Sequence, residues 1–320
     1  MTVAYSQTGW AAASPGRAAA TEALSDEVLI RRIANGDQLA MRTLFGRHRL
    51  PIYRWLLRLV DDEALADDLK IEHVGFAHDA LSSSCSSGNA FEVTLRGLSE
   101  RELLAAAQWA CQREVWDRCI NTSERTRTAI DFEQRFPMPH KEAVIARSKT
   151  INLDPAYVYG LIRQESRFVT DARSHVGASG LMQVMPATAK WTARKIGLTG
   201  FTPDQISDRD TNIAIGTGYL KLVLDSFEGS MPLAAGAYNA GPSRSRRWRA
   251  PNDGSGPILE GAIWAENVPF HETRDYVKKV LSNTTNYAAL ITGQPQSLKA
   301  KLGLVGPRDA SAPAENLELP

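Results

Sequence analysis

The sequence contains little cysteine, and its cysteines form no recognisable pattern. Three occur among 320 residues, at Cys85, Cys111 and Cys119, without a C-x-x-C pair. An odd count of this kind argues against a disulfide framework or a zinc knuckle. Cys111 and Cys119 fall on one expected helix, where their spacing of eight residues corresponds to about 12 Å, too far for a disulfide. We therefore expect three ordinary thiols.

Other absences exclude further classes of protein. The six histidines occur singly without an H-E-x-x-H pattern, so we expect no metal and no cofactor. No run of eighteen apolar residues suggests a transmembrane helix. The net charge of +1 offers no general attraction to nucleic acid or an anionic membrane. The first twenty residues carry one arginine and no apolar run of signal-peptide length, so as written the chain is expected to stay in the cytoplasm.

Composition and length indicate a folded protein with more than one part. Hydrophobic residues make up 43% and charged residues 23%, which is ordinary for soluble domains. We expect the following organisation: a disordered leader over 1–24, helices over 25–70, a serine-rich linker over 71–94, a helical segment over 95–136, a larger domain over 137–293 and a disordered tail over 294–320.

A carboxylate on an otherwise apolar helix face is the first candidate for chemistry. Asp154 followed by proline predicts a helix start, and the apolar face continues through Val158, Leu161 and Ile162. The next position on that face is Glu165. Burial of an unpaired charge is costly. Either a basic partner neutralises Glu165, or desolvation raises its pKa and leaves it able to donate a proton. Position alone leaves both readings open.

The residues that follow suit a sugar-binding loop. Gly180 allows a sharp turn and close approach to a ligand, Ser179 and Gln183 offer hydrogen bonds, and Met182 adds soft apolar surface. Further helices are expected from about 186 to 197, from Asp210 to 227, from about 232 to 240 and after Pro269. The third of these ends on a Tyr-Asn pair, where Gly-Pro stops the helix.

Four short motifs occur in order: E-S-R-F from Glu165, G-A-S-G-L-M-Q from Gly177, A-Y-N-A-G from Ala237 and E-T-R-D-Y-V from Glu272. With them, residues 137–290 resemble the catalytic domain of the soluble lytic murein transglycosylases. Residues 95–136 resemble the end of the helical region that precedes it. The resemblance implies a mainly α fold, with an α+β lysozyme-like catalytic domain after a small helical N-terminal segment.

The resemblance also implies an activity and a site. Glu165 is the expected catalytic acid and base, and the expected glycan-cleft residues are Ser179, Met182, Gln183, Tyr238, Asn239, Glu272 and Tyr276. Glu272 has a second reading as charge compensation at a helix start, and Tyr238 as a core tyrosine. The implied substrate is the MurNAc-GlcNAc β-1,4 bond of peptidoglycan strands, cleaved without water to a 1,6-anhydro end, in the periplasm or cell envelope. A lysozyme-type muramidase, in which water attacks, is the alternative.

A basic run follows the third motif, with Arg244, Arg246, Arg247 and Arg249 around Trp248. Such a run is able to bind carboxylates of peptide stems. More often a run of this kind is a solvated face. Both readings stay open from the sequence.

Residues 25–69 carry a different resemblance. The segments DEVLIRRIANGD, LFGRHRLPIYRWLLRLV and DEALADDL resemble the start of region 2 of the extracytoplasmic-function sigma factors. This implies contact with RNA polymerase core through 25–69, and a regulator with an inert second half as a rival function. Residues 1–70 hold nine basic and nine acidic residues, so no basic footprint supports DNA binding. We favour a helical pair kept for packing.

Overall fold

The computed structural model describes residues 97–249, 256–309, 311–312 and 316–320, together with Leu95 and scattered positions between 25 and 47. The chain divides into two compact units, Met1–Trp109 with Arg125–Ala129 and Ala110–Glu124 with Ile130–Pro320. The expected leader, the serine-rich linker and most of the sigma-like segment lie outside the described residues.

In the first unit, α6 (Glu100–Gln112) begins at a capping box. The backbone N–H of Ser99 donates to the Glu102 carboxylate over 2.7 Å, and Ser99 Oγ accepts from the Glu102 N–H. The Glu100 carboxylate accepts hydrogen bonds from the backbone N–H groups of residues 127–129. These bonds hold the 125–129 loop against the start of α6.

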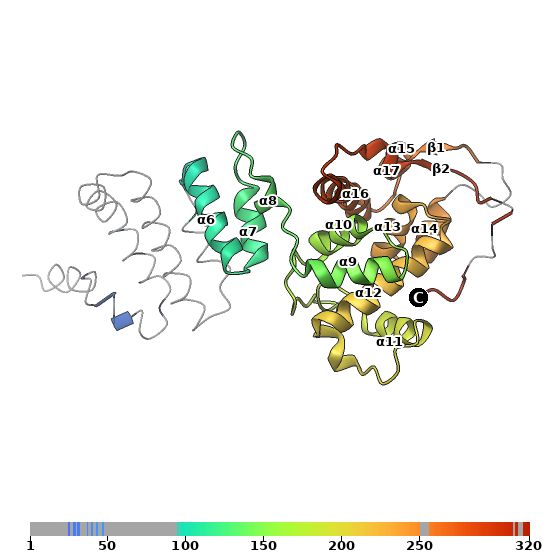
Figure 1. Ribbon diagram of the computed structural model, residues 1–320, viewed down its shortest axis with the longest axis horizontal. Coiled ribbons are helices and arrows are strands. Elements are labelled where there is room, and N and C mark those ends of the chain that lie inside the picture. The colour runs from blue at the N-terminus through green and yellow to red at the C-terminus, as the bar shows by residue number, and fades with distance from the viewer. Residues whose placement is uncertain are drawn as a thin grey trace, which may run out of the picture. The chain divides into compact units, whose positions relative to one another are not determined.

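The second unit is mainly helical, in agreement with the expected fold class (Figure 1). Its only described strands, β1 (Leu259–Glu260) and β2 (Leu304–Val305), pair antiparallel with Leu259 opposite Val305. A 3-10 helix, η1, spans Pro203–Ser207. The α-helices are α7 (Trp116–Ser123), α8 (Phe132–Arg135), α9 (Lys141–Thr150), α10 (Pro155–Glu165), α11 (Pro186–Lys195), α12 (Arg209–Ser226), α13 (Met231–Ala240), α14 (Pro242–Trp248), α15 (Gly261–Glu266), α16 (His271–Thr292) and α17 (Leu298–Leu302).

Helix α10 is the buried centre of this unit, between α9 and α16 (Figure 1). Asp154 caps it by accepting from the Ala156 N–H over 2.9 Å, as the sequence predicts. Its apolar side chains are fully buried. At Gly160 a Cβ would stand 2.8 Å from the backbone nitrogen of Thr284 in α16. Only glycine permits this approach, so Gly160 sets the spacing of the two helices that carry the site.

The expected helices of the larger domain form, with small shifts at their ends. Helices α11, α13 and α16 begin within one residue or two of the expected positions. Helix α12 is capped by Asp208 and not by Asp210, because Asp208 Oδ1 accepts from the Thr211 N–H over 2.8 Å. No helix in the described part of the chain is both long and apolar enough to cross a membrane.

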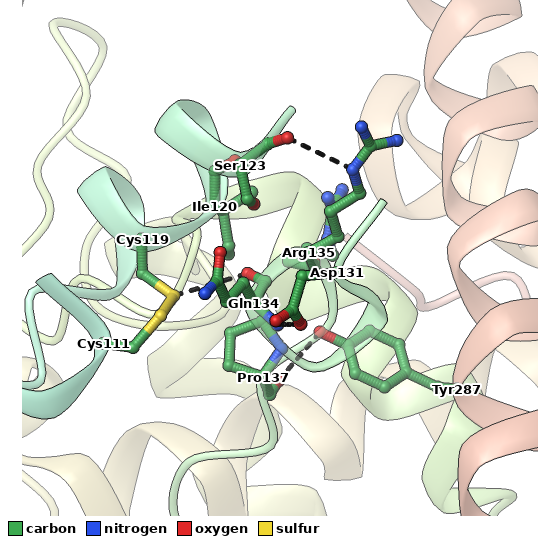
Figure 2. The surroundings of a disulfide bond; sticks show 10 residues. Cys111, Cys119, Ile120, Ser123, Asp131, Gln134, Arg135, Pro137 and Tyr287 are labelled. Atoms are coloured by element: carbon green, nitrogen blue, oxygen red, sulfur yellow. Dashed lines mark hydrogen bonds between the residues drawn. A yellow bond between two sulfur atoms is a disulfide. The ribbon is translucent and has the colours of Figure 1, made fainter. Parts of the chain in front are cut away.

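The expectation for the cysteines is wrong, because Cys111 and Cys119 form a disulfide (Figure 2). The spacing argument assumed one continuous helix. Instead α6 ends at Gln112, Glu114 adopts a left-handed φ of 60° and α7 starts at Trp116. The reversal brings the two Cα atoms to 4.9 Å, within the range that a disulfide needs. Cys119 Sγ also lies 3.4 Å from the carbonyl oxygen of Gln134, at α8.

The expectation of a disordered tail over 294–320 also fails for the residues described there. The segment contains α17 and β2, and it buries Leu302, Val305 and Leu319. The Tyr219 hydroxyl donates to the carbonyl oxygen of Pro320 over 3.1 Å. The Pro, Ala and Gly composition suggested disorder, but a few apolar side chains anchor the segment on the core.

Candidate active site

Glu165 is the last residue of α10, where the chain turns sharply. Arg167 and Phe168 both have left-handed φ values, 48° and 68°. The Ser166 hydroxyl holds this turn by donating to the Leu181 carbonyl over 2.8 Å and accepting from the Phe168 N–H. The C-terminal end of a helix carries partial negative charge, which disfavours an ionised carboxylate. The position alone therefore favours the protonated form of Glu165.

The surroundings of Glu165 act in the same direction. The pKa of Glu165 is raised to about 8, because burial and, to a smaller extent, the negative charge of Glu272 outweigh a hydrogen bond from Tyr276 that lowers it. The Tyr276 hydroxyl donates to Glu165 Oε1 over 2.5 Å. No described lysine or arginine forms an ion pair with Glu165. Of the two readings left open by the sequence, the structure supports a carboxyl group that is protonated near neutral pH.

Glu165 opens into a pocket of about 390 Å³. The pocket is formed by the end of α10, the end of α13 and the first turns of α16. Four predicted site residues meet there: Glu165, Asn239, Glu272 and Tyr276. The sequence analysis missed the other four lining residues, which are Gln164, His271, Asp275 and Lys279. The last three recur at every fourth position of α16, so a helical pattern beside the fourth motif was the available signal.

A tight loop between α10 and α11 supports the pocket wall. Ser179 forms isolated β-bridges with Arg173 and Val184. The buried amide of Asn212 on α12 fixes the loop: its Oδ1 accepts from the Met182 N–H over 2.8 Å, and its Nδ2 donates to the Ser179 carbonyl over 3.0 Å. A Cβ at Gly180 would stand 2.1 Å from Nδ2 of this amide. The second motif thus needs glycine because a buried side chain occupies that space.

The other predicted residues of this region take different places. The Met182 side chain is fully buried, and a Cβ at Gly216 would stand 2.4 Å from its sulfur. Gln183 Nε2 donates to the carbonyls of Ala172 and Gly180, over 3.0 and 2.8 Å, and thereby closes the loop on itself. The contacts of Ser179, Met182 and Gln183 with a glycan stay predictions.

Tyr238, which was predicted to line the cleft, is bonded to this loop and is not among the lining residues of the pocket. Its hydroxyl donates to the Met182 carbonyl over 2.9 Å. Burial raises the pKa of Tyr238 well above its usual value, and the charges of Glu165 and Tyr219 add to the shift. The phenol therefore stays neutral and remains a hydrogen-bond donor near Glu165.

Asn239 is oriented by a residue that the sequence analysis missed. The buried Thr273 hydroxyl donates to Asn239 Oδ1 over 2.7 Å. Asn239 lines the pocket, and with its carbonyl oxygen engaged its NH₂ group remains as a hydrogen-bond donor. Thr273 belongs to the E-T-R-D-Y-V motif, so the motif contained it without indicating its partner.

Behind the acid, Arg163 ties α10 to three other segments. It is 7% exposed, and its guanidinium donates to the Arg135 carbonyl, to Asn283 Oδ1 and to Glu124 Oε1, over 2.9, 3.2 and 2.6 Å. The same group lies 4.5 Å from the centroid of the Phe136 ring. Because Arg163 precedes Glu165 by two residues, these contacts fix the end of α10 that carries the acid.

Two segments of the chain match known protein families. Residues 142–258 match the family model "Transglycosylase SLT domain", and residues 267–296 match "Soluble lytic transglycosylase helical domain". The soluble lytic murein transglycosylase of Escherichia coli K12 is 32% identical over 207 residues, which are 64% of this chain and 32% of that protein. Its counterpart in Salmonella typhimurium is 33% identical over 205 residues, 64% and 31% of the two chains. The chain thus spans about a third of the length of these relatives.

Two solved structures share the fold. The lytic transglycosylase Slt of Pseudomonas aeruginosa, in an inactive mutant, has a TM-score of 0.61 and 33% identity over 77% of this chain and 38% of that one. The 70 kDa soluble lytic transglycosylase of E. coli has a TM-score of 0.61 and 25% identity, over 88% and 48%. The expected lysozyme-like fold is confirmed. Nothing in these comparisons supports the sigma-factor resemblance of residues 25–69 or a contact with RNA polymerase.

Proposed function

We propose that this protein cleaves the β-1,4 bond between MurNAc and GlcNAc in peptidoglycan without water, as a lytic transglycosylase. The observation that carries the proposal is the position of Glu165 at the wall of a pocket, hydrogen-bonded to Tyr276 and with a raised pKa. The match to the transglycosylase SLT domain supports it. So does the P. aeruginosa relative, whose structure is that of an inactive mutant with glutamine in place of a glutamate.

In the first step Glu165 acts as a general acid. Its proton goes to the glycosidic oxygen, and the bond from that oxygen to the anomeric carbon of MurNAc breaks. The leaving sugar departs with a hydroxyl group. The carbonyl oxygen of the substrate's own 2-acetamido group stabilises the positive charge left at the anomeric carbon, as in substrate-assisted glycosidases. A pKa near 8 keeps the proton available for this step at neutral pH.

In the second step the same carboxylate acts as a base. It takes the proton from the 6-hydroxyl of the muramic acid residue, and the 6-oxygen bonds to the anomeric carbon. The product is a 1,6-anhydro end, and Glu165 returns to its protonated form. Tyr276 holds the carboxylate through both steps, since its phenol keeps its proton throughout. The reaction consumes no water and needs no second protein carboxylate.

A lysozyme-type hydrolase is the second candidate. Glu272 and Asp275 line the same pocket, and either carboxylate would serve to activate a water in an inverting reaction. Asp171, the nearest downstream acid in the sequence, is exposed and is not among the lining residues. We therefore expect Asp171→Asn to keep most of the activity under either mechanism.

We further propose that the protein acts in the cell envelope, where its substrate lies. The Cys111–Cys119 disulfide supports this location, because such bonds persist in oxidising compartments and are rare in the cytosol. Curated relatives include a protein named membrane-bound lytic murein transglycosylase C, from Actinobacillus pleuropneumoniae. The expectation that the chain stays in the cytoplasm has no support from these findings.

The deciding experiment is mass spectrometry of muropeptides released from purified sacculi by the full chain. Transglycosylation predicts products that are lighter by one water, about 18 mass units, than those of a hydrolase, and ends that resist borohydride reduction. Glu165→Gln is the matched control. It keeps the shape of the side chain and should lower the rate by about 10² or more. Reducible ends at the hydrated mass would place the protein among the hydrolases.

A further inference from the structure

We propose that Arg244 and Phe270 form a carboxylate-binding subsite at the rim of the pocket, which binds the peptide attached to the glycan. The proposal rests on the proposed function, since it specifies a second part of the same substrate. Arg244 belongs to the basic run around Trp248, for which the sequence allows either carboxylate binding or a solvated face. The structure shows that Arg244 differs from Arg249 of the same run in its surroundings.

Arg244 lies next to two walls of the pocket. Its Nη1 donates to the carbonyl oxygen of Ala240 over 2.7 Å, and Ala240 directly follows the lining residue Asn239. Its guanidinium carbon lies 5.4 Å from the centroid of the Phe270 ring, and Phe270 directly precedes the lining residue His271. Adjacent Cα atoms are about 3.8 Å apart. The proposal therefore places the pair at the edge of the pocket, between the C-terminal end of α13 and the start of α16.

Both side chains are available to a ligand. Arg244 is exposed and Phe270 is 47% exposed. No carboxylate in the described part of the chain forms an ion pair with Arg244, whereas Arg249 of the same run is buried and bonded to Glu228 over 2.7 Å. A guanidinium has five N–H donors in a planar fork, of which the Ala240 carbonyl engages one. The rest suit a bidentate bond to a carboxylate.

The Phe270 ring, over which Arg244 lies, is also held in place. The Phe270 ring meets Trp248 edge-on at 5.3 Å between centroids, and the Trp248 carbonyl accepts from the Trp264 indole over 2.9 Å. The ring thus has a fixed neighbour on one side, while Arg244 lies over it. A cation stacked on an aromatic ring loses less freedom when it binds an anion.

The charges of the site indicate which part of the substrate belongs there. Two carboxylate side chains, Glu272 and Asp275, outnumber the single lysine, Lys279, in the pocket lining, so its interior suits neutral sugar rings better than anions. Within an intact glycan strand the sugars are neutral, and carboxylates occur on the peptide that each muramic acid carries. A strand seated with its sugars at Glu165 projects these peptides outward toward the rim. Arg244 offers the complementary charge at that place.

The test compares two substrates. One is glycan strands that carry their peptides, with amino groups acetylated. The other is the same strands with the peptide carboxyls amidated by carbodiimide and methylamine. We expect Arg244→Gln to lower kcat/KM roughly tenfold on the first substrate and to leave it unchanged on the second. Arg244→Lys should recover only part of the loss, because lysine lacks the planar fork. Arg194→Gln, an exposed arginine on α11, is the control and should change neither value.

An equal loss on both substrates, or no loss on either, would overturn the subsite. Binding of both strands to the Glu165→Gln protein, with and without Arg244→Gln, gives a readout independent of turnover. There the expected result is a roughly tenfold weaker Kd for carboxylate-bearing strands alone. A wild type that cleaves neither strand contradicts the proposed activity, while the binding comparison still decides the subsite.

Discussion

The Tyr276 hydroxyl donates to Glu165 Oε1 over 2.5 Å and joins two residues that lie 111 positions apart in the chain. One helix ends at the acid and the other brings the phenol to it. This bond lowers the pKa of Glu165, while burial and the charge of Glu272 raise it. The balance of these three effects sets the pH range in which Glu165 carries its proton. Substitutions of Tyr276 and Glu272 test two of the effects separately.

Tyr276→Phe should raise the pKa of Glu165, because it removes the hydrogen bond that favours the ionised form. The acid must be protonated in the free enzyme, so kcat/KM of the wild type should fall above about pH 8. The variant should show this fall at higher pH, with kcat near neutrality reduced about tenfold through loss of orientation. Tyr287→Phe on the same helix is the control, since its hydroxyl bonds to the distant Pro137 carbonyl. A downward shift of the alkaline limb would contradict the assignment.

Glu272→Gln should move the alkaline limb in the opposite direction. The negative charge of Glu272 raises the pKa of Glu165, and its removal lowers that pKa. The fall of kcat/KM with rising pH should then begin earlier than in the wild type. Glu266→Gln removes an exposed acid that pairs with Lys278, and should leave the profile unchanged. An unmoved limb in Glu272→Gln would show that the two carboxyl groups do not interact.

Glu165→Gln should stabilise the fold at pH 8. In the folded protein the pKa of Glu165 is raised from 4.5 to about 8, so the stability that its protonated form provides is full below pH 4.5 and is lost as pH rises through 8. Glutamine never ionises and avoids this loss. The variant should melt higher than the wild type at pH 8, by about 2–4 °C per kcal/mol, and the difference should disappear near pH 4. Equal melting temperatures at both pH values would argue against a buried acid.

Asn212→Ala should destabilise the second unit by about 3 kcal/mol. It leaves the Met182 N–H and the carbonyls of Ser179 and Ile206 without their partner, and each such buried group costs about 1–3 kcal/mol. Urea unfolding measures the effect. Asn267→Ala is the matched control, because that exposed amide bonds only to the Ile263 carbonyl of its own helix. A loss below 1 kcal/mol would mean that water replaces the Asn212 amide.

Reduction of the Cys111–Cys119 disulfide should lower the free energy of unfolding by about 2.5 kcal/mol. The bond closes a short loop, with a sequence separation of 8, and chain entropy predicts this magnitude for such a loop. Urea unfolding with and without dithiothreitol measures the difference, and Cys111→Ser should reproduce it. Cys85→Ser keeps the disulfide and should unfold like the wild type. Identical midpoints for the oxidised and reduced protein would show that the bond adds no stability.

Local rules predicted the helices well. The Asp-Pro start of α10, the apolar face that ends on Glu165 and the Gly-Pro end of α13 all depend on residues close in sequence. The same rules placed the cap of α12 two residues too late, because Asp208 and Asp210 are both acceptable caps from sequence alone.

Contacts between distant residues were beyond those rules. Nothing in the order of residues shows that Thr273 orients Asn239 or that Asn212 fills the space over Gly180. The cysteine error has the same origin, since a single left-handed residue, Glu114, turned one expected helix into two. Met182 was predicted to line the cleft from its motif; its side chain is buried in the core, and a contact with a glycan stays a prediction.

The contacts of Arg163 bear on where a truncated form of this protein can begin. A fragment starting at residue 137, the edge suggested by the motifs, would lack Glu124, Arg135 and Phe136, and with them the ion pair, the carbonyl hydrogen bond and the ring contact that hold Arg163. The lost segment also contains both cysteines of the disulfide. We therefore expect the smallest fragment that folds on its own to start near Ala110, some thirty residues before the family match at 142. Residues that precede the family match, Glu124 and Arg135 among them, thus hold the end of α10 that carries Glu165.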